Sequence, residues 1–420
     1  MDDFVLREGR LFAERVPLAA IAARVGTPTF VYSRATLLGH FRRLRDAYAP
    51  VRPVIRYAMK ANANLAILRA LAEEGAGFDV VSRGEIFRVI RAGGDPSRID
   101  FAGVGKRRDE IDVALDARID TFNVESEAEL ELIDEAARAR GRQARVALRV
   151  NPDVDPKTHT YITTGKKENK FGLDFERARR VAATLPARTG VTLTGLHVHI
   201  GSQITQVRPY VEMVTRLLAL ARELRAAHPT LRSVNIGGGF GIHYRENEAP
   251  EIADYARELV PLLLESGFEV QMEPGRLLVG NAGILLTRVL YVKRGGERRF
   301  VICDAAMNDL LRPSLYGAFH RIEPEKPRPG VPEPADVVGP VCESGDFLGK
   351  DRDLPPIEPG DLLCVRSAGA YAFVMSSQYN ARPRAAEVMV DGDRFGVARA
   401  RETEEDLVRG ETPAPDWMRA

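Results

Sequence analysis

Residues 54–82 are VIRYAMKANANLAILRALAEEGAGFDVVS, and this stretch decides the fold. An apolar run with strand-forming residues (54–60) precedes a helix-like segment, LAILRALAEE, and a second apolar run (77–82) follows. This order predicts two parallel strands joined by a helical crossover. The first run ends on Lys60, whose amine either leaves the core for water or is kept in place for chemistry.

The same strand–helix pattern continues to about residue 276. Its apolar runs are 54–60, 77–82, 98–103, 119–124, 145–151, 193–201, 233–239 and 269–276, with amphipathic stretches such as 125–141 and 211–227 between them. Buried strands that alternate with helices indicate a parallel sheet. Eight units over roughly 220 residues predict a closed (β/α)8 barrel. An open doubly wound sheet is the alternative, but it suits eight parallel strands and a β-rich tail less well.

The pattern changes after Arg276, where helical gaps give way to short polar or glycine-rich gaps. The apolar runs there are 284–293, 299–305, 335–342, 361–369, 385–392 and 395–400, and a Pro-rich loop is expected at 325–336. Apolar runs separated by such short gaps predict an antiparallel β domain. We therefore expect a barrel over 33–280 and a C-terminal β domain over 281–420, to which the N-terminal segment 1–32 contributes strands.

Composition excludes several classes of function. The chain has 420 residues, 45% hydrophobic and 28% charged, with a formal net charge of +1. This balance gives no general field for nucleic acid or for an anionic membrane. No apolar stretch is long enough to span a bilayer, and the early acidic residues predict no signal peptide. Three widely spaced cysteines without a CxxC pair fit a reducing cytosol, so we expect a cytoplasmic protein.

Polar residues gather where the predicted strands end, which is where barrels of this kind carry their chemistry. They are Lys60, Asp79, Ser82, Arg149, Asn151, His199, Gly201, Ser202, the glycines 237–239, Glu273 and Arg276. A barrel built for stability alone has no need of a lysine, two arginines, a histidine and a glutamate around one rim. We therefore expect the active site there.

The glycines 237–239 follow the seventh apolar run. Residues without side chains let backbone amides approach an anion closely, and the seventh strand of a barrel is a frequent phosphate site. A tight turn between strand and helix is the alternative. The position in the barrel favours phosphate.

His197 and His199 are two residues apart and point to the same side of a strand. An HxH pair can bind a metal, but a metal site needs further ligands on neighbouring strand ends, and the remaining histidines supply no such set. We therefore expect no metal and interpret His199 as an aromatic surface for a flat ligand. With the Lys60 amine, a phosphate site and the Glu273 carboxylate, the rim matches the needs of pyridoxal 5′-phosphate (PLP).

Nine motifs occur in the order and spacing of a known family. They are YAMKAN (57–62), FDVVSRGE (78–85), KTHTYITTGKKENKFG (157–172), HVHIGSQ (197–203), GGGFG (237–241), EPGR (273–276), MNDLLRPSLY (307–316), CESGD (342–346) and GAY (369–371). With them, the chain resembles the barrel-type PLP-dependent decarboxylases of the alanine-racemase-like group over nearly its whole length. It is most similar to the branch that acts on diaminopimelate.

The resemblance implies roles for individual residues. Lys60 is expected to carry PLP as a Schiff base, His199 to lie against the ring, and Glu273 to pair with the ring nitrogen. The phosphate is expected at Ser202, Gly238 and Gly239. The other residues implied around the cofactor are Asp79, Glu85, Pro274, Gly275, Arg276 and Tyr371.

The resemblance also implies a substrate and a dimer. Arg276, Arg312, Tyr316, Glu343 and Tyr371 are expected to bind substrate, and Cys342 to reprotonate the carbanion carbon. Cys342 and Glu343 are expected to reach the site from the other subunit of a homodimer. The implied reaction is decarboxylation of meso-2,6-diaminopimelate at its D-centre, giving L-lysine and CO2 in the last step of lysine biosynthesis.

Other interpretations of these residues stay open. Free cysteines are usually inert core residues, but Cys342 has Glu343 beside it and glycines on both sides, as in an active-site loop. Arg312 and Tyr316 share one face of a helical turn and form either a surface pair or a fork for a carboxylate. The alternative functions are a decarboxylase for ornithine, arginine or carboxynorspermidine, a PLP-binding homologue without catalysis, and a metal-dependent barrel hydrolase.

Overall fold

The computed structural model describes residues 2–155, 170–245, 248–415 and 417–418. Their contacts divide the chain into two units. The barrel unit comprises Arg34–Ala282 and Gly369–Tyr371, and the sheet unit comprises Met1–Ser33, Gly283–Ala368 and Ala372–Ala420. The length and polarity of segment 153–171 predict a lid over the active site, but most of this segment lies outside the described residues.

The barrel unit holds a closed parallel barrel, as the sequence predicts. Its strands pair in the order β10-β11-β12-β5-β6-β7-β8-β9. The bounds are β5 (Val54–Ala58), β6 (Gly77–Val80), β7 (Ile99–Phe101), β8 (Thr121–Val124), β9 (Ala144–Arg149), β10 (Val191–His197), β11 (Ser233–Asn235) and β12 (Glu269–Met272). β12 pairs with β5, which closes the ring.

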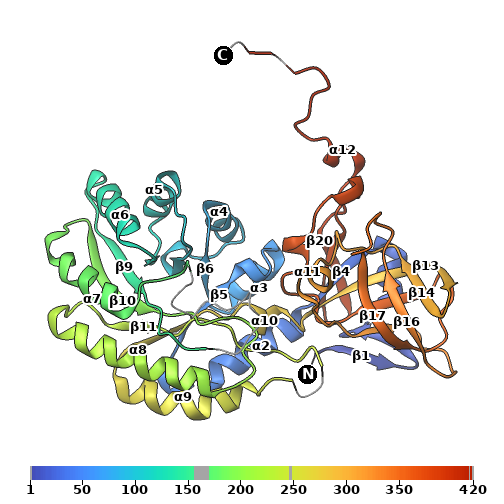
Figure 1. Ribbon diagram of the computed structural model, residues 1–420, viewed down its shortest axis with the longest axis horizontal. Helices are drawn as coiled ribbons and strands as arrows, with labels where there is room; N and C mark the ends of the chain where they lie inside the picture. The colour runs from blue at the N-terminus through green and yellow to red at the C-terminus, as the bar shows by residue number, and fades with distance from the viewer. Residues whose placement is uncertain (1, 156–169, 246–247, 416, 419–420) are drawn as a thin grey trace. The chain divides into compact units, whose positions relative to one another are not determined.

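Helices surround the barrel strands (Figure 1). They are α2 (Arg34–Ala47), α3 (Leu65–Glu73), α4 (Arg83–Arg91), α5 (Arg108–Ala117), α6 (Glu127–Ala139), α7 (Phe175–Thr184), α8 (Arg208–Ala227), α9 (Ile252–Ser266) and the short α10 (Arg276–Val279). Local chemistry starts several of them directly after a strand. The side chains of Asn64, Ser82 and Ser126 accept backbone N–H bonds at the starts of α3, α4 and α6. Such caps satisfy donors that a helix cannot satisfy itself.

The sheet unit contains a larger sheet, a three-stranded sheet and short helices. The strands are β1 (Phe4–Arg7), β2 (Arg10–Ala13), β3 (Val16–Pro17), β4 (Thr29–Ser33), β13 (Gly283–Gly295), β14 (Arg298–Cys303), β15 (Ile322–Pro324), β16 (Glu333–Val338), β17 (Phe347–Leu354), β18 (Leu362–Val365), β19 (Ala386–Asp391) and β20 (Arg394–Arg399). The helices are α1 (Leu18–Val25), α11 (Arg312–Tyr316) and α12 (Glu404–Leu407). The main path of the larger sheet runs β17-β16-β14-β13-β4-β19-β20, and β18 pairs with both β13 and β15.

Four details of the sheet unit differ from the sequence prediction. The sheet is mixed, because β14 pairs with β16 and β4 with β19 in parallel. Of the N-terminal strands only β4 enters the larger sheet, while β1, β2 and β3 form their own. The strands β15 and β17 were not predicted. The expected loop 325–336 is shorter, because β16 begins at Glu333. Pairing partners depend on contacts between distant segments, which local patterns do not encode.

The packing of α9 against the barrel gives a stability test. Leu263 is buried, whereas the next residue, Leu264, is 58% exposed. We expect Leu263→Ala to lower the free energy of unfolding by about 2–5 kcal/mol, because it leaves a cavity. Leu264→Ala is the matched control and should change it by less than about 0.5 kcal/mol. Urea unfolding of both variants measures the difference, and equal losses would contradict this packing.

Candidate active site at the carboxyl ends of the barrel strands

Lys60 lies in a short 3₁₀ turn that follows β5 directly. Its Nζ donates a hydrogen bond to Oδ2 of Asp79 at 2.5 Å, and Asp79, on β6, is fully buried. Burial alone lowers the pKa of Lys60, but the carboxylates of Asp79 and Glu273 outweigh it and leave the pKa raised. The amine is therefore held as a cation against Asp79, although the Lys60 side chain is 36% exposed.

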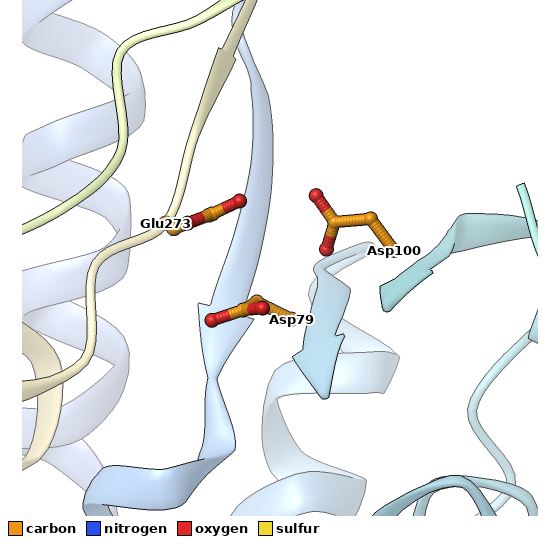
Figure 2. A group of neighbouring side chains, drawn as sticks. All are labelled: Asp79, Asp100 and Glu273. Atoms are coloured by element: carbon orange, nitrogen blue, oxygen red, sulfur yellow. The ribbon is translucent and has the colours of Figure 1, made fainter. Parts of the chain in front are cut away.

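Asp79, Asp100 and Glu273 lie together inside the barrel, and Figure 2 shows their carboxyl groups side by side. One oxygen of each lies within 4.8 Å of the others. Burial, and then the charge of Asp79, raise the pKa of Glu273 to about 7, against the opposing effect of Lys60. Because Lys60 already binds Asp79 and lies in the field of Glu273, we assign no metal ion to this group.

The two histidines of HVHIG have different environments. Nε2 of His197 lies 2.9 Å from Oε2 of Glu273 deep in the barrel. Nδ1 of His199 accepts a hydrogen bond from the backbone N–H of Gly238 at 3.3 Å. Burial, followed by the charge of Arg149, lowers the pKa of His197 to about 3 and that of His199 well below its usual value. Both rings are therefore neutral.

The glycines 237–239 leave no room for a side chain. A Cβ on Gly238 would lie 2.0 Å from the carbonyl oxygen of Glu273, and one on Gly239 would lie 2.2 Å from that of Gly201. Gly237 and Gly239 also have positive φ angles of 69° and 96°. The backbone here packs more closely than any other residue type would allow.

Arg276 contacts several of the residues that the sequence predicts for the site. Its guanidinium donates to Oγ of Ser202 at 3.0 Å and to the hydroxyl of Tyr244 at 2.5 Å. It also lies 4.9 Å from the ring centre of Tyr371. Tyr371 has a φ of 54°, in the left-handed region that side chains other than glycine rarely adopt, as is typical of functional positions. Its backbone N–H donates to the carbonyl of Ala61, next to Lys60.

The remaining predicted residues of the barrel unit support this arrangement. The carbonyl of Pro274 accepts from the N–H of Ala58, and a Cβ on Gly275 would lie 3.1 Å from the carbonyl oxygen of Ala58. The EPGR segment is thereby fixed against the strand end that carries Lys60. Glu85 accepts from the backbone N–H of Val81 at 2.7 Å, and burial raises its pKa to about 7.

Four predicted residues lie in the sheet unit. Arg312 and Tyr316 are the ends of α11, and buried Arg312 lies 3.0 Å from Nε2 of His320. Cys342 and Glu343 are exposed, and the N–H of Cys342 donates to Oδ1 of Asn380 at 2.8 Å. The other two cysteines, Cys303 and Cys364, are buried, as expected of core residues.

The sequence prediction missed the side chains that contact Glu273 in the barrel interior. Asn123 and Asn235 both donate to its Oε1, at 3.3 and 2.7 Å, and Asp100 lies beside them. A signal was present, because each of these residues interrupts a short apolar strand inside the barrel. Tyr244 was also missed, and a tyrosine in an irregular segment gives no such signal.

Comparison with known proteins supplies the class. Residues 34–280 match the family "Pyridoxal-dependent decarboxylase, pyridoxal binding domain". Diaminopimelate decarboxylase from Pseudomonas aeruginosa is 49% identical over 415 residues, 99% of this chain and all of that one.

Solved structures agree. Diaminopimelate decarboxylase from Helicobacter pylori, complexed with L-lysine, has a TM-score of 0.90 at 41% identity, over 93% of this chain and 98% of that one. The enzyme from M. jannaschii, also with L-lysine, has a TM-score of 0.93 at 37% identity over 98% of both chains. The chain belongs to the pyridoxal-dependent decarboxylases, and within them to the diaminopimelate decarboxylase family.

The chain is thus a carboxy-lyase with PLP as its cofactor, and its residues fit that group. The barrel unit offers an amine, a side-chain-free backbone segment, neutral imidazoles and a buried carboxylate. These are the chemical partners of an aldehyde, a phosphate, an aromatic face and a pyridine nitrogen. None of the helices in the described part of the chain has the length and apolar character of a membrane span.

The glycine segment gives a test of cofactor binding. Gly238→Ala should displace the Glu273 backbone, at a cost of about 1–3 kcal/mol. If this cost destabilises the PLP-bound protein relative to the apo-protein, the Kd for PLP rises roughly 5- to 150-fold. Gly39→Ala in α2 is the control, because a Cβ there meets nothing within 4 Å. Fluorescence titration of both apo-proteins measures the two Kd values, and an unchanged Kd for Gly238→Ala would contradict the assignment.

Proposed function

We propose that Lys60 forms the Schiff base with PLP and that the chain thereby decarboxylates meso-2,6-diaminopimelate to L-lysine and CO2. One observation carries this proposal. The Lys60 amine lies at a strand end inside a barrel, bonded to Asp79 and within the field of Glu273. A lysine with only a structural role has no need of two buried carboxylates.

When bound, PLP accepts the electron pair that is released as the carboxylate leaves as CO2. Glu273 keeps a negative charge at the ring nitrogen, and its buried position makes that charge effective. Neutral His199 lies against the ring face without competing for a proton. Ser202, Gly238, Gly239 and Arg276 hold the phosphate, and Tyr371 closes this side of the site next to Arg276.

Substrate recognition follows from the two amino-acid ends of diaminopimelate. Arg276 and Arg312 suit carboxylates, because a guanidinium binds two oxygens at once. Glu343 suits the distal ammonium group, and Tyr316 lies one helical turn from Arg312. Ornithine and arginine lack the distal amino-acid centre, so this set favours diaminopimelate. The L-lysine in the related structures belongs to those proteins and fits the same product here.

Cys342 delivers the proton to the carbon that loses CO2. Its exposure, together with that of Glu343, supports a role in a site completed by a second copy of the chain. The protein is then a homodimer in which each active site uses both subunits. A cytoplasmic location accords with the free cysteines.

A substrate panel tests the activity. Purified holoenzyme is incubated separately with meso-diaminopimelate, L-lysine and L-ornithine, and CO2 is measured. We expect release from meso-diaminopimelate alone. Lys60→Ala should abolish both CO2 release and the visible absorbance of lysine-bound PLP, whereas Lys293→Ala at the exposed end of β13 should change neither. CO2 from ornithine would favour the related basic amino-acid decarboxylases, and none from any substrate would favour a non-catalytic homologue.

Mixing two inactive variants tests the shared site. Lys60→Ala and Cys342→Ala should each be inactive, and Cys342→Ala should keep the PLP absorbance. If subunits exchange at random, half of the dimers are mixed and each has one intact site, so roughly a quarter of wild-type activity returns. Lys60→Ala mixed with the double variant is the control and should stay inactive. No recovery in verified mixed dimers would place Cys342 in the same subunit as Lys60.

A further inference from the structure

Glu273 is one member of a polar layer that crosses the barrel interior. We define the layer as Asp100 on β7, Asn123 on β8, His197 on β10, Asn235 on β11 and Glu273 after β12. All five are buried. No role proposed above for the cofactor or the substrate uses Asp100.

Asp100 and Glu273 are joined through the two amides. Nδ2 of Asn235 lies 2.7 Å from Oε1 of Glu273 and 3.2 Å from Oδ2 of Asp100. Nδ2 of Asn123 lies 3.3 and 3.4 Å from the same two oxygens. Each amide therefore bridges the two carboxyl groups, and holds them close together away from water.

The charges around the layer do not balance if both carboxyl groups are ionised. The cations that face it already have partners: Lys60 binds Asp79, Arg149 binds Glu125, and Arg56 and Arg145 both bind Asp120. Arg56 also forms an ion pair with Oδ2 of Asp100 at 3.7 Å, but it shares its charge with Asp120. His197 is neutral and adds no charge. Among the described residues, five acids, with Asp100 and Glu273 included, thus face four cations, and one more proton restores neutrality.

The oxygen atoms indicate where that proton resides. Oδ2 of Asp100 accepts from both amides, whereas no N–H or hydroxyl among the described residues reaches buried Oδ1. A buried oxygen without a donor is unfavourable unless it carries a proton itself. Burial raises the pKa of Asp100 well above its usual range, although Arg56 acts in the opposite direction.

We propose that Asp100 is a neutral acid that donates a hydrogen bond to Glu273, and is a positioning residue for the decarboxylation. Asn123, Asn235, His197 and Asp100 then all direct donors at Glu273, which stays a carboxylate beneath the cofactor. The consequence for PLP rests on the role proposed for Glu273, but the proton on Asp100 does not.

Proton linkage in the apo-protein tests the neutral acid directly. Asp100 carries its proton when folded but ionises in the unfolded chain above about pH 4. Folding therefore binds one more proton in wild type than in Asp100→Asn, and the stability of wild type relative to this variant falls as pH rises from 5 to 8. Urea unfolding across this range measures the difference. A stability difference that does not change with pH would overturn the proposal. It would mean that Asp100 is ionised in the folded protein, or that Glu273 carries the proton in both wild type and variant.

Asp120→Asn is the control for this measurement. Asp120 binds the same Arg56 but lies outside the layer. Asp120→Asn should leave the pH dependence of the free energy of unfolding as in wild type. If it changes this dependence as much as Asp100→Asn does, the proton belongs to the Arg56 cluster and the proposal is overturned.

PLP binding separates this inference from the role of Glu273. Asp100→Asn keeps an uncharged donor, so its Kd for PLP and its cofactor absorbance should stay within about twofold of wild type. Asp100→Ala removes the donor and should weaken binding at least about tenfold, with a pH-dependent absorbance. If Asn fails as badly as Ala, the neutral donor is wrong. If the stability difference depends on pH as expected but neither variant changes the Kd or the absorbance of PLP, Asp100 is a neutral acid and the role proposed for Glu273 is wrong.

Discussion

Burial of charge inside a closed barrel is the constraint on which the rest of the barrel unit depends. A carboxylate such as Asp79 or Glu273 is costly away from water unless cations and donors face it. Lys60, Arg56 and Arg149 supply the cations, each from a different strand or strand end. The barrel brings these groups together because its parallel strands direct them into one interior, and removal of one partner would leave another charge buried without its counter-ion.

The same electrostatics couples the amine of Lys60 to the carboxylate of Glu273. Lys60 lowers the pKa of Glu273, and Glu273 raises that of Lys60. If Lys60 binds PLP as proposed, its amine would keep a positive charge facing Asp79 and Glu273 only as long as its nitrogen stays protonated. The two carboxylates would therefore favour the protonated form of that nitrogen.

The sequence predicted most of this architecture from local pattern. Eight strand–helix units and the polar residues at their ends sufficed to place Lys60, His199 and Glu273 in one barrel and to imply PLP. The layer around Asp100 was missed, because single polar residues in strands of three or four residues show no periodicity that links one strand to the next. The parallel pairing of β4 with β19 also escaped, since segments more than 350 residues apart meet there. Such features depend on tertiary contacts.

The segment Gly369–Tyr371 has a consequence for how the chain can be divided. These three residues belong to the barrel unit, although the sheet unit surrounds them in sequence. Asn62 donates to the carbonyl of Gly369, Gly369 donates to that of Gly280, and Tyr371 donates to that of Ala61. A gene fragment that ends at residue 282 contains every barrel strand but lacks part of the wall beside Lys60. Recombination of whole domains at that boundary would therefore separate Lys60 from Tyr371, which is encoded almost ninety codons after residue 282.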